Sequence, residues 1–303
     1  MSIIPEEKKE SRNNLNSFLF QNEGVLYMSK YLVLSDLDDT LLTSEKTIQR
    51  QTKDFLELFV KRGNIFSICT GRPYSGCIHF YNEIGLKNMP MVTDNGCAIY
   101  NLDGKNKFFE IPLDIFKAFL EETKGMDAYM YTTTGYDISY AHNLRFVPRW
   151  IIHDENPGLK IIEGEPSKVT KLPPLICNYW VKAECIDAFL KIIDKYKDEI
   201  FYMNWGRYFQ EDLNDDIYSI EIHSSHASKG HALRYLKEYY HIDDNKTLAF
   251  GDQLNDISMI EEAYYGVAMV NAVELLKQKT EYQTDLDFNN NGVIDFIKKR
   301  NLF

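Results

Sequence analysis

The chain has 303 residues, 44% of them apolar and 26% charged, which suits one or two globular domains and excludes a disordered or fibrous chain. The formal net charge of -11 opposes association with nucleic acid and with anionic membranes, and we expect neither partner. The five cysteines are scattered and no apolar run has the length of a signal peptide or a membrane span, which predicts a cytoplasmic protein without a disulfide framework.

The first part of the chain predicts a tail followed by an α/β unit. Residues 1–28 are polar and lack useful periodicity, so we expect a polar N-terminal tail. Apolar runs at 31–35 and 64–69 predict buried parallel strands, with an amphipathic helix between them at 46–63. The segment 90–96 predicts a third strand that closes at an Asn-Gly turn. Strand, helix and strand in this order are typical of a doubly wound parallel sheet.

The middle of the chain follows a different pattern. Residues 127–142 and 217–223 alternate between apolar and polar side chains, which predicts antiparallel strands, and 184–200 predicts an amphipathic helix. Helices and apolar strands alternate again after this insertion. We therefore predict an α/β fold with a doubly wound parallel-sheet core and an inserted α+β cap, divided as core 29–97, cap 98–222 and core 223–303.

Polar residues with obvious chemical use follow three predicted strands of the core. Asp36 and Thr70 come directly after the first two strands, and Asp252 follows an apolar run at 247–251. Open α/β sheets bind ligands at the carboxyl ends of their strands. If the three strands are neighbours, these residues converge on one crevice.

The acidic cluster Asp36 to Asp39 predicts a magnesium site. Carboxylates this close repel one another unless a cation lies among them, and carboxylate oxygens are natural ligands of Mg²⁺. Asp36 could attack phosphorus, and Asp38 could protonate the leaving oxygen and later deprotonate water. Lys229 opens a predicted helix, where its ammonium and the helix N-terminus would act together on an anion. The alternative is that the cluster is only an acidic loop between a strand and a helix.

Four motifs in this order resemble those of the haloacid-dehalogenase superfamily of phosphatases, and the insertion resembles the cap of its Cof-type branch. The motifs are Asp36-Leu37-Asp38-Asp39-Thr40, Thr70-Gly71-Arg72, Ser228-Lys229-Gly230 and Gly251-Asp252-Gln253-Leu254-Asn255-Asp256.

The resemblance implies a site and a cofactor. It implies Mg²⁺ held by Asp36, the backbone carbonyl of Asp38, and Asp252, with Asp256 in support. It implies a set of residues at the substrate phosphate: Leu37, Thr70, Gly71, Lys229 and Asn255. Candidate contacts of the substrate or the cap are Arg72, Asn95 and Asn271.

Two positions depart from the family pattern. Asp39 stands where many members have Gly, which adds a charge near the expected metal. Val270 stands where the branch usually has Gly, just before Asn271. A β-branched residue does not easily take a positive φ, so we expect the loop that carries Asn271 to be placed differently.

The function that these observations favour is hydrolysis of phosphate monoesters of small metabolites, such as a sugar phosphate, nucleotide or cofactor phosphate, through an aspartyl-phosphate intermediate. One alternative is a phosphomutase or phosphotransferase acting on sugar phosphates, which needs the same nucleophile and acid. A second is a ligand sensor that keeps the fold without turnover. The cap is rich in aromatic residues, most of which we expect to pack its sheet while one or two face the crevice.

Overall fold

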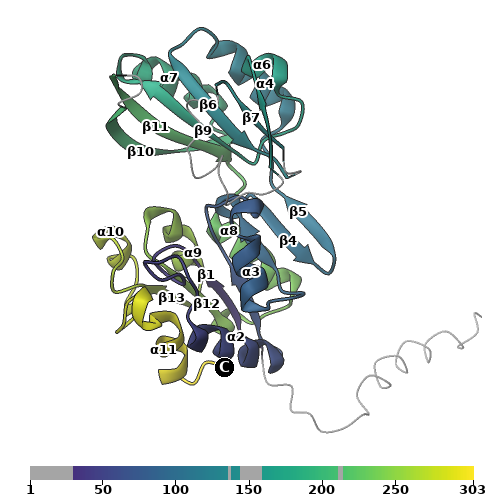
Figure 1. Ribbon diagram of the computed structural model, residues 1–303, viewed down its shortest axis with the longest axis vertical. Helices are drawn as coiled ribbons and strands as arrows, with labels where there is room; N and C mark the ends of the chain where they lie inside the picture. Colours follow the sequence, from purple (N-terminus) through teal and green to yellow (C-terminus); the bar gives the residue numbers. More distant parts are fainter. Residues whose placement is uncertain (1–29, 136–137, 144–158, 211–213) are drawn as a thin grey trace, which may run out of the picture.

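A computed structural model describes residues 30–135, 138–143, 159–210 and 214–303, so the tail predicted at 1–28 lies outside the described residues. The described chain forms two lobes joined by narrow connections (Figure 1). One lobe holds the N-terminal and C-terminal parts of the described chain, and the other holds the middle part. We refer to them as the core and the cap.

The core is built on a parallel sheet. Within the described residues it has five strands in the order β14, β13, β12, β1 and β2. Their bounds are β1 (Leu32–Ser35), β2 (Ile65–Ile68), β12 (Thr247–Gly251), β13 (Tyr265–Ala268) and β14 (Tyr282–Gln283). β3 (Met91–Thr93) continues this arrangement, because Val92 forms a parallel bridge with Cys69 just beyond β2.

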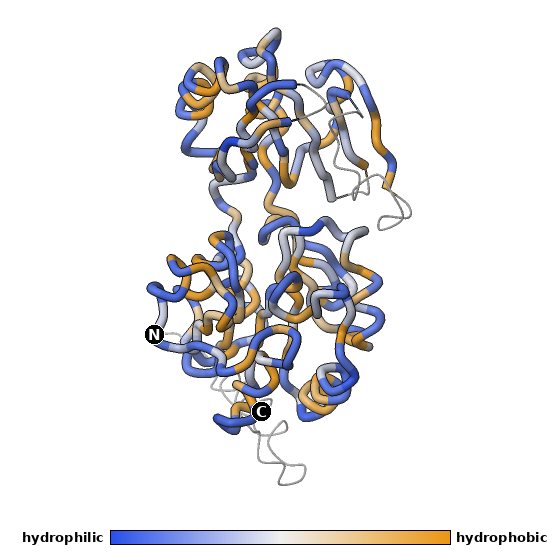
Figure 2. The backbone as a smooth tube through the Cα atoms, turned by 60° about the vertical axis from the view of Figure 1, so that its left-hand side comes forward, coloured by the Kyte–Doolittle hydropathy of each residue, from blue (hydrophilic) through white to orange (hydrophobic). Residues whose placement is uncertain are grey.

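Helices cover the core sheet, and this explains why its central strands are apolar throughout. Every residue of β1, β2 and β12 is buried, as expected for parallel strands with both faces covered. Figure 2 shows hydrophobic segments of the chain inside both lobes. The helices of the core are α2 (Arg50–Lys61), α3 (Ile78–Ile84), α8 (Lys229–Tyr239), α9 (Ile257–Glu262), α10 (Glu274–Lys277) and α11 (Gly292–Lys299).

The cap is an α+β unit with a mostly antiparallel sheet. Its described strands lie in the order β10, β11, β9, β6, β7 and β8, and only β7 and β8 pair in parallel. The strands are β6 (Ala128–Thr133), β7 (Ile138–Ala141), β8 (Lys160–Glu163), β9 (Ile176–Lys182), β10 (Ile200–Gln210) and β11 (Asp215–Ser224). The helices within the described part of the cap are α4 (Leu113–Glu122), α6 (Pro166–Val169) and α7 (Ile186–Ile193).

The two faces of the cap sheet differ, because side chains alternate along each strand. One face packs against α4 and α7 through a cluster that includes Met130, Tyr179 and Ile220. The intervening residues line a cavity on the other face, among them Asn178, Ser219 and Glu221. The cap therefore presents polar side chains where the core lies.

The hairpin of β4 (Ala98–Leu102) and β5 (Lys105–Phe108) packs with the core. β4 pairs with β3, and its apolar side chains join the hydrophobic cluster of the core. The sequence pattern placed the start of the cap at residue 98. The packing instead favours a cap that begins after β5.

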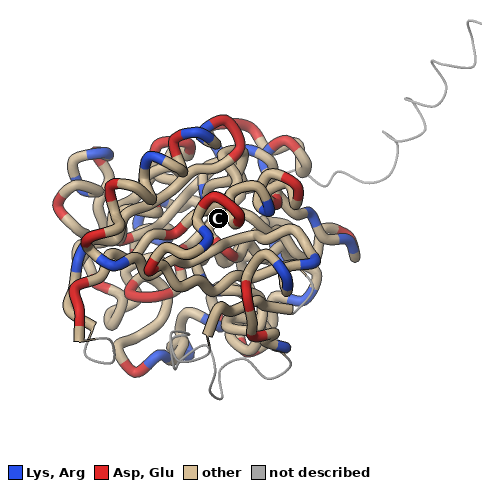
Figure 3. The backbone as a smooth tube through the Cα atoms, turned by 90° about the horizontal axis from the view of Figure 1, so that it is seen from above, with Lys and Arg blue, Asp and Glu red and all other residues tan. Residues whose placement is uncertain are grey.

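Charged residues of both signs are distributed over the described part of the chain. In the view of Figure 3, Lys and Arg are interspersed with Asp and Glu rather than gathered in one block. In the part of the chain that the structure describes, no helix has the length and apolar character needed to cross a membrane.

Candidate active site

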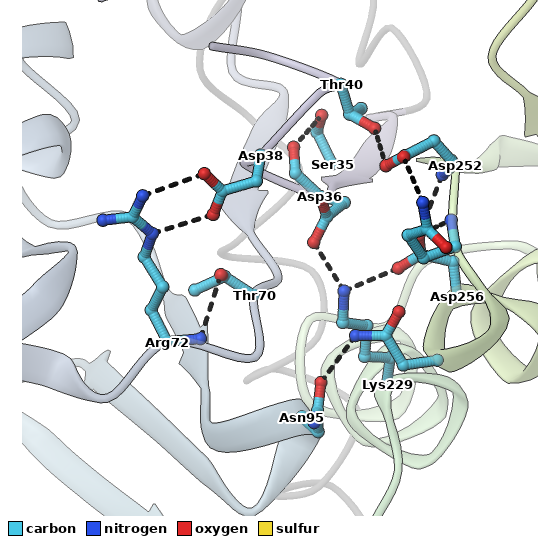
Figure 4. A network of polar contacts seen from close by, with 12 residues as sticks. Ser35, Asp36, Asp38, Thr40, Thr70, Arg72, Asn95, Lys229, Asp252 and Asp256 are labelled. Atoms are coloured by element: carbon cyan, nitrogen blue, oxygen red, sulfur yellow. Dashed lines mark hydrogen bonds and ion pairs between the residues drawn. The ribbon is translucent and has the colours of Figure 1, made fainter. Parts of the chain in front are cut away.

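Three neighbouring strands deliver the predicted residues to one edge of the core sheet. β12, β1 and β2 are adjacent, and Asp252, Asp36 and Thr70 lie just beyond their carboxyl ends. Figure 4 shows these side chains around one centre. The convergence that the sequence predicted is therefore present.

A buried lysine connects the carboxylates of this centre. Lys229 is the first residue of α8, and its side chain has no exposed surface. Its Nζ lies 2.6 Å from Asp36 Oδ1 and 2.5 Å from Asp256 Oδ1. Burial alone would lower the pKa of Lys229, but the charges of Asp256 and Asp36 outweigh burial and raise it, so the amine stays protonated.

Asp256 is committed to protein contacts on both oxygens. Oδ1 accepts from Lys229, while Oδ2 accepts from the backbone N–H groups of Asp252 and Gln253 at 2.8 and 2.9 Å. A Cβ on Gly251 would lie 2.4 Å from the Asp256 carboxyl carbon, so glycine is needed for this approach. Asp256 thus fixes both Lys229 and the loop that carries Asp252.

The carboxylates outnumber the ammonium that they share. Burial raises the pKa of Asp36 well above its ordinary value, and neighbouring Asp256 and Asp252 act in the same direction against Lys229. Burial, and then the charge of Asp256, raise the pKa of Asp252 to about 6. Groups perturbed in this way, in a cavity, are typical of a functional site.

The donor set fits a hard divalent cation. Ligand oxygens of Asp36, Asp252 and Asp256 lie within 4.8 Å of one another, and all three residues are buried. Asp36 and Asp252 line the cavity, whereas Asp256 does not, and Asp256 is held by Lys229 and by two backbone N–H groups. Asp36 and Asp252 are therefore the carboxylates placed to bind a metal. Thr40 Oγ1 donates to Asp252 Oδ1 at 3.1 Å and orients that carboxylate.

Asp38 points away from Asp36 and pairs with two cations. Arg72 binds it through Nε and Nη2, both at 2.8 Å, and Lys46 Nζ lies 2.9 Å from Oδ1. Figure 4 shows the fork of Arg72 against this carboxylate. Burial alone would raise the pKa of Asp38, but the hydrogen bonds and charges of Arg72 and Lys46 outweigh it and lower the pKa.

The remaining phosphate-binding candidates lie around the same cavity, whose volume is about 240 Å³. Thr70, Gly71 and Asn255 line it together with Asp36. Thr70 Oγ1 accepts from the backbone N–H of Arg72 at 3.1 Å. Leu37 does not line the cavity; its side chain is fully buried in the core cluster, which leaves only its backbone for a ligand.

Asn95 lies on a left-handed turn between β3 and β4. Asp94, Asn95 and Gly96 all have positive φ, of 51°, 52° and 95°. A Cβ on Gly96 would lie 2.2 Å from the Ser228 carbonyl oxygen, so glycine allows this turn to pack against the start of α8. Asn95 accepts from Asn255 at 2.9 Å and donates to Glu221 of the cap at 2.7 Å.

Asp94 is a buried carboxyl group on the same turn. Thr133 and Thr93 donate to its two oxygens at 2.6 and 2.8 Å. Burial nevertheless raises the pKa of Asp94 to about 7, with a smaller contribution from the charge of Glu221. Its folded pKa therefore lies about three units above the usual value for the unfolded chain.

This difference predicts that Asp94→Asn makes the protein more stable at alkaline pH. Ionisation of the buried Asp94 carboxyl group destabilises the folded wild type. This destabilisation is absent below about pH 4, grows as pH rises to about 7, and is constant above that. We expect the variant to exceed the wild type in unfolding free energy by about 2–4 kcal/mol near pH 8, and by less near pH 5. Urea unfolding at both values measures this difference. Parallel pH dependences of the two proteins would contradict it.

The two departures from the family pattern have structural explanations. Asp39 has a φ of 53°, a region in which Gly is favoured and Asp is tolerated. Val270 is not among the described residues with positive φ, so its β-branched side chain is not forced into an unfavourable backbone conformation. Asn271 Nδ2 donates to the Asp39 carbonyl at 2.8 Å, which ties the two loops together.

Sequence reasoning missed several residues that the structure places at the site. Lys46 and Glu221 contact predicted residues, but no motif marks them. Trp205 was only one of many cap aromatics, yet it lines the cavity that contains Asp36. The sequence offers one local indication that Trp205 is unusual among these aromatics. It is followed by Gly206, and glycine inside a strand often marks a bulge.

A doubly wound sheet with carboxylates and a buried lysine at its strand ends, beneath an α+β lobe, defines a capped α/β enzyme. A family model described as haloacid dehalogenase-like hydrolase matches residues 33–297. The chain belongs to this family.

Relatives and solved structures agree with this assignment. The Bacillus subtilis protein YitU, named a 5-amino-6-(5-phospho-D-ribitylamino)uracil phosphatase, is 26% identical over 275 residues, which cover 89% of this chain and 97% of that protein. Thermotoga maritima TM0651 matches with a TM-score of 0.73 at 22% identity, covering 89% and 97% of the two chains. BT4131, described as a subclass IIB sugar phosphatase, matches with a TM-score of 0.69 at 19% identity, covering 90% and 100%.

These findings confirm the resemblance, the α/β fold class and the prediction of a haloacid-dehalogenase-type phosphatase. The roles of individual residues stay predictions.

Proposed function

We propose that the chain is a Mg²⁺-dependent phosphatase that hydrolyses phosphate monoesters of small metabolites through a phosphorylated Asp36. The observation that supports this most directly is the buried contact of Lys229 with Asp36 and Asp256 at the edge of the catalytic cavity. A nucleophilic carboxylate beside a fixed ammonium suits attack on a phosphoryl group, because the ammonium balances the negative charge of the oxygens.

The proposed metal would be held by Asp36, Asp252 and the backbone carbonyl of Asp38. When bound, Mg²⁺ supplies positive charge to the attacking and transferring oxygens. Asp256 keeps Lys229 and the Asp252 loop in place, since its own oxygens are taken. Thr70, with Gly71 beside it, lines the space where the phosphoryl oxygens would lie.

The covalent step transfers the phosphoryl group to the protein. An oxygen of Asp36 bonds to phosphorus while the bond from phosphorus to the leaving oxygen breaks. Asp38 gives a proton to that oxygen, so an alcohol departs. Asp38 then takes a proton from water, which attacks phosphorus, releases inorganic phosphate and restores Asp36.

The acid role requires Asp38 to leave its present partners. Arg72 and Lys46 stabilise its ionised form and lower its pKa, and a carboxylate held in that form is a poor proton donor. The proposal therefore includes release of Asp38 from Arg72 when a substrate occupies the cavity.

The test of the function is release of inorganic phosphate from a panel of phosphorylated metabolites with Mg²⁺. The panel includes hexose phosphates, nucleotides, cofactor phosphates and 5-amino-6-(5-phospho-D-ribitylamino)uracil. We expect release that stops in excess chelator. Undiminished release in chelator would refute the metal requirement. Phosphate transferred to a second hydroxyl without free phosphate would indicate a phosphotransferase.

Asp38→Asn should distinguish substrates by their leaving groups. A sugar alkoxide needs a proton to depart, so we expect a loss of about 10²–10⁴ in turnover, whereas nitrophenolate departs with little help and should lose much less. Steady-state rates on both esters measure this contrast. Asp39→Asn is the matched control, because it removes a neighbouring charge and should slow both substrates by a similar factor. Equal losses for Asp38→Asn on the two esters would remove Asp38 from the acid role.

A further inference from the structure

The catalytic cavity opens toward a second cavity of about 320 Å³ under the cap sheet. Both are lined by Gly71, Trp205 and Asn255. Since the first cavity holds the groups proposed to act on phosphorus, the second is positioned for the leaving group. Its lining decides which leaving groups fit.

The described lining of this second cavity carries negative charge and no positive charge. Among the described residues that form it, none is Lys, Arg or His, and two are the buried carboxyl groups of Asp94 and Glu221. Both oxygens of Asp94 accept from threonine hydroxyls. Glu221, with 7% of its surface exposed, uses Oε1 to accept from Asn95. Its other oxygen has no hydrogen-bond partner among the described residues.

A hydrogen-bond relay fixes the direction in which Glu221 presents this free acceptor. Asn255 Nδ2 donates to Asn95 Oδ1 at 2.9 Å, and Asn95 Nδ2 donates to Glu221 Oε1 at 2.7 Å. Successive bonds of this kind strengthen one another in a buried site. Glu221 is therefore held from the core side, although it belongs to cap strand β11.

Aromatic side chains complete the cavity. The pairing of β10 with β11 shifts between Asn204 and Gly206, so Trp205 lies at a β-bulge. Gly206 has a φ of 104°, which glycine adopts without strain. Trp205 is 43% exposed and lines both cavities, and buried Trp180 lines the second. These rings supply flat apolar surface beside the carboxylates.

We propose that the second cavity receives the leaving group and that Glu221 selects uncharged or cationic groups that donate hydrogen bonds, such as polyols, against groups that carry a second anion. This inference rests on the proposed phosphatase function and deepens it. A hydroxyl or ammonium group satisfies the free oxygen of Glu221, whereas a carboxylate or second phosphate meets a buried like charge in a cavity whose described lining holds no Lys, Arg or His.

A matched pair of substrates tests this selection. Sorbitol 6-phosphate and 6-phosphogluconate have the same open carbon chain and the same phosphorylated position, but the second ends in a carboxylate. We expect kcat/KM of the wild type to favour sorbitol 6-phosphate by at least about tenfold. Both compounds are also measured as competitors of nitrophenyl phosphate hydrolysis, so a compound that is not turned over still gives an inhibition constant.

Glu221→Gln should remove much of this preference. Gln keeps the size of the side chain and an acceptor for Asn95 but loses the charge. We expect the two substrates to differ in kcat/KM by no more than about threefold in this variant, because kcat/KM for 6-phosphogluconate rises. Asp215→Asn makes the same charge change on the same strand, outside the cavity, and should leave the ratio as in the wild type. Melting curves confirm that each variant is folded.

The outcomes separate this inference from the proposed function. No hydrolysis of nitrophenyl phosphate by the wild type would refute the function itself. If the wild type hydrolysed nitrophenyl phosphate but had a kcat/KM for 6-phosphogluconate equal to or above that for sorbitol 6-phosphate, the proposed selection would be wrong and the phosphatase function would stand. This comparison needs no variant. If folded Glu221→Gln kept the wild-type ratio of kcat/KM for the two compounds, Glu221 would not be the residue that selects the leaving group. Failure of both compounds to compete at millimolar concentration would exclude this role as well.

Discussion

Asp36→Asn should abolish phosphate release while the protein stays folded. The substitution keeps the shape of the side chain but removes the attacking oxygen and one carboxylate proposed for the metal. Lys229 keeps its second partner, Asp256, so the buried ammonium is not left unpaired. We expect turnover to fall by at least about a thousandfold, with a cooperative melting transition retained.

Acid-quenched mass spectrometry adds a readout that does not depend on rate. The wild type mixed with substrate and Mg²⁺ should carry an added phosphoryl group on the peptide that contains Asp36, and Asp36→Asn should carry none. Asp39→Asn, with a neighbouring charge removed, should still form the adduct. If Asp36→Asn keeps more than about a tenth of wild-type turnover, the covalent mechanism is wrong.

The sequence predicted the core well because its strands are buried on both faces. Such strands are short apolar runs, and a polar residue at the end of each marks the carboxyl edge of the sheet. Asp36, Thr70 and Asp252 were therefore placed correctly before any contact was known. The start of the cap was harder to predict, because the packing of the β4–β5 hairpin against the core leaves no local signal in the sequence.

The partners of the site residues could not be predicted in the same way. Arg72 binds Asp38 across 34 positions, and Asn95 binds Glu221 across 126. Such contacts depend on how the lobes and loops pack, and no spacing in the sequence encodes them. The sequence predicted that Asp38 acts as the acid, but only the structure shows its carboxylate held in the ionised form by Arg72 and Lys46.

Lys229→Met should destabilise the protein strongly when metal is absent. Met has a similar length, so the substitution removes the charge with little loss of packing. Asp36 and Asp256 would then be buried without the ammonium that they share. Breaking a buried ion pair by removing one partner typically costs about 3–5 kcal/mol, and we expect a loss of this size in excess chelator.

Magnesium and pH should modulate this loss in directions that identify its cause. A divalent cation bound only by the folded state restores positive charge near Asp36, so Mg²⁺ should stabilise Lys229→Met more than the wild type. Unpaired buried carboxyl groups have raised pKa values, and their penalty grows with pH, so the deficit should be smaller near pH 5 than near pH 8. Urea unfolding at both pH values, with Mg²⁺ and with chelator, measures both effects.

Lys46→Met is the matched control for this experiment. Lys46 also pairs with carboxylates, at 2.9 Å from Asp38 and 3.5 Å from Asp39, but its side chain is 47% exposed. Exposed ion pairs contribute little, so we expect a change within about 1 kcal/mol and a response to Mg²⁺ like that of the wild type. If the two variants were equally stable in chelator, Lys229 would not balance the buried carboxylates. The electrostatic basis of the proposed site would then fail, because Asp36 and Asp256 would have to be neutral in the folded protein.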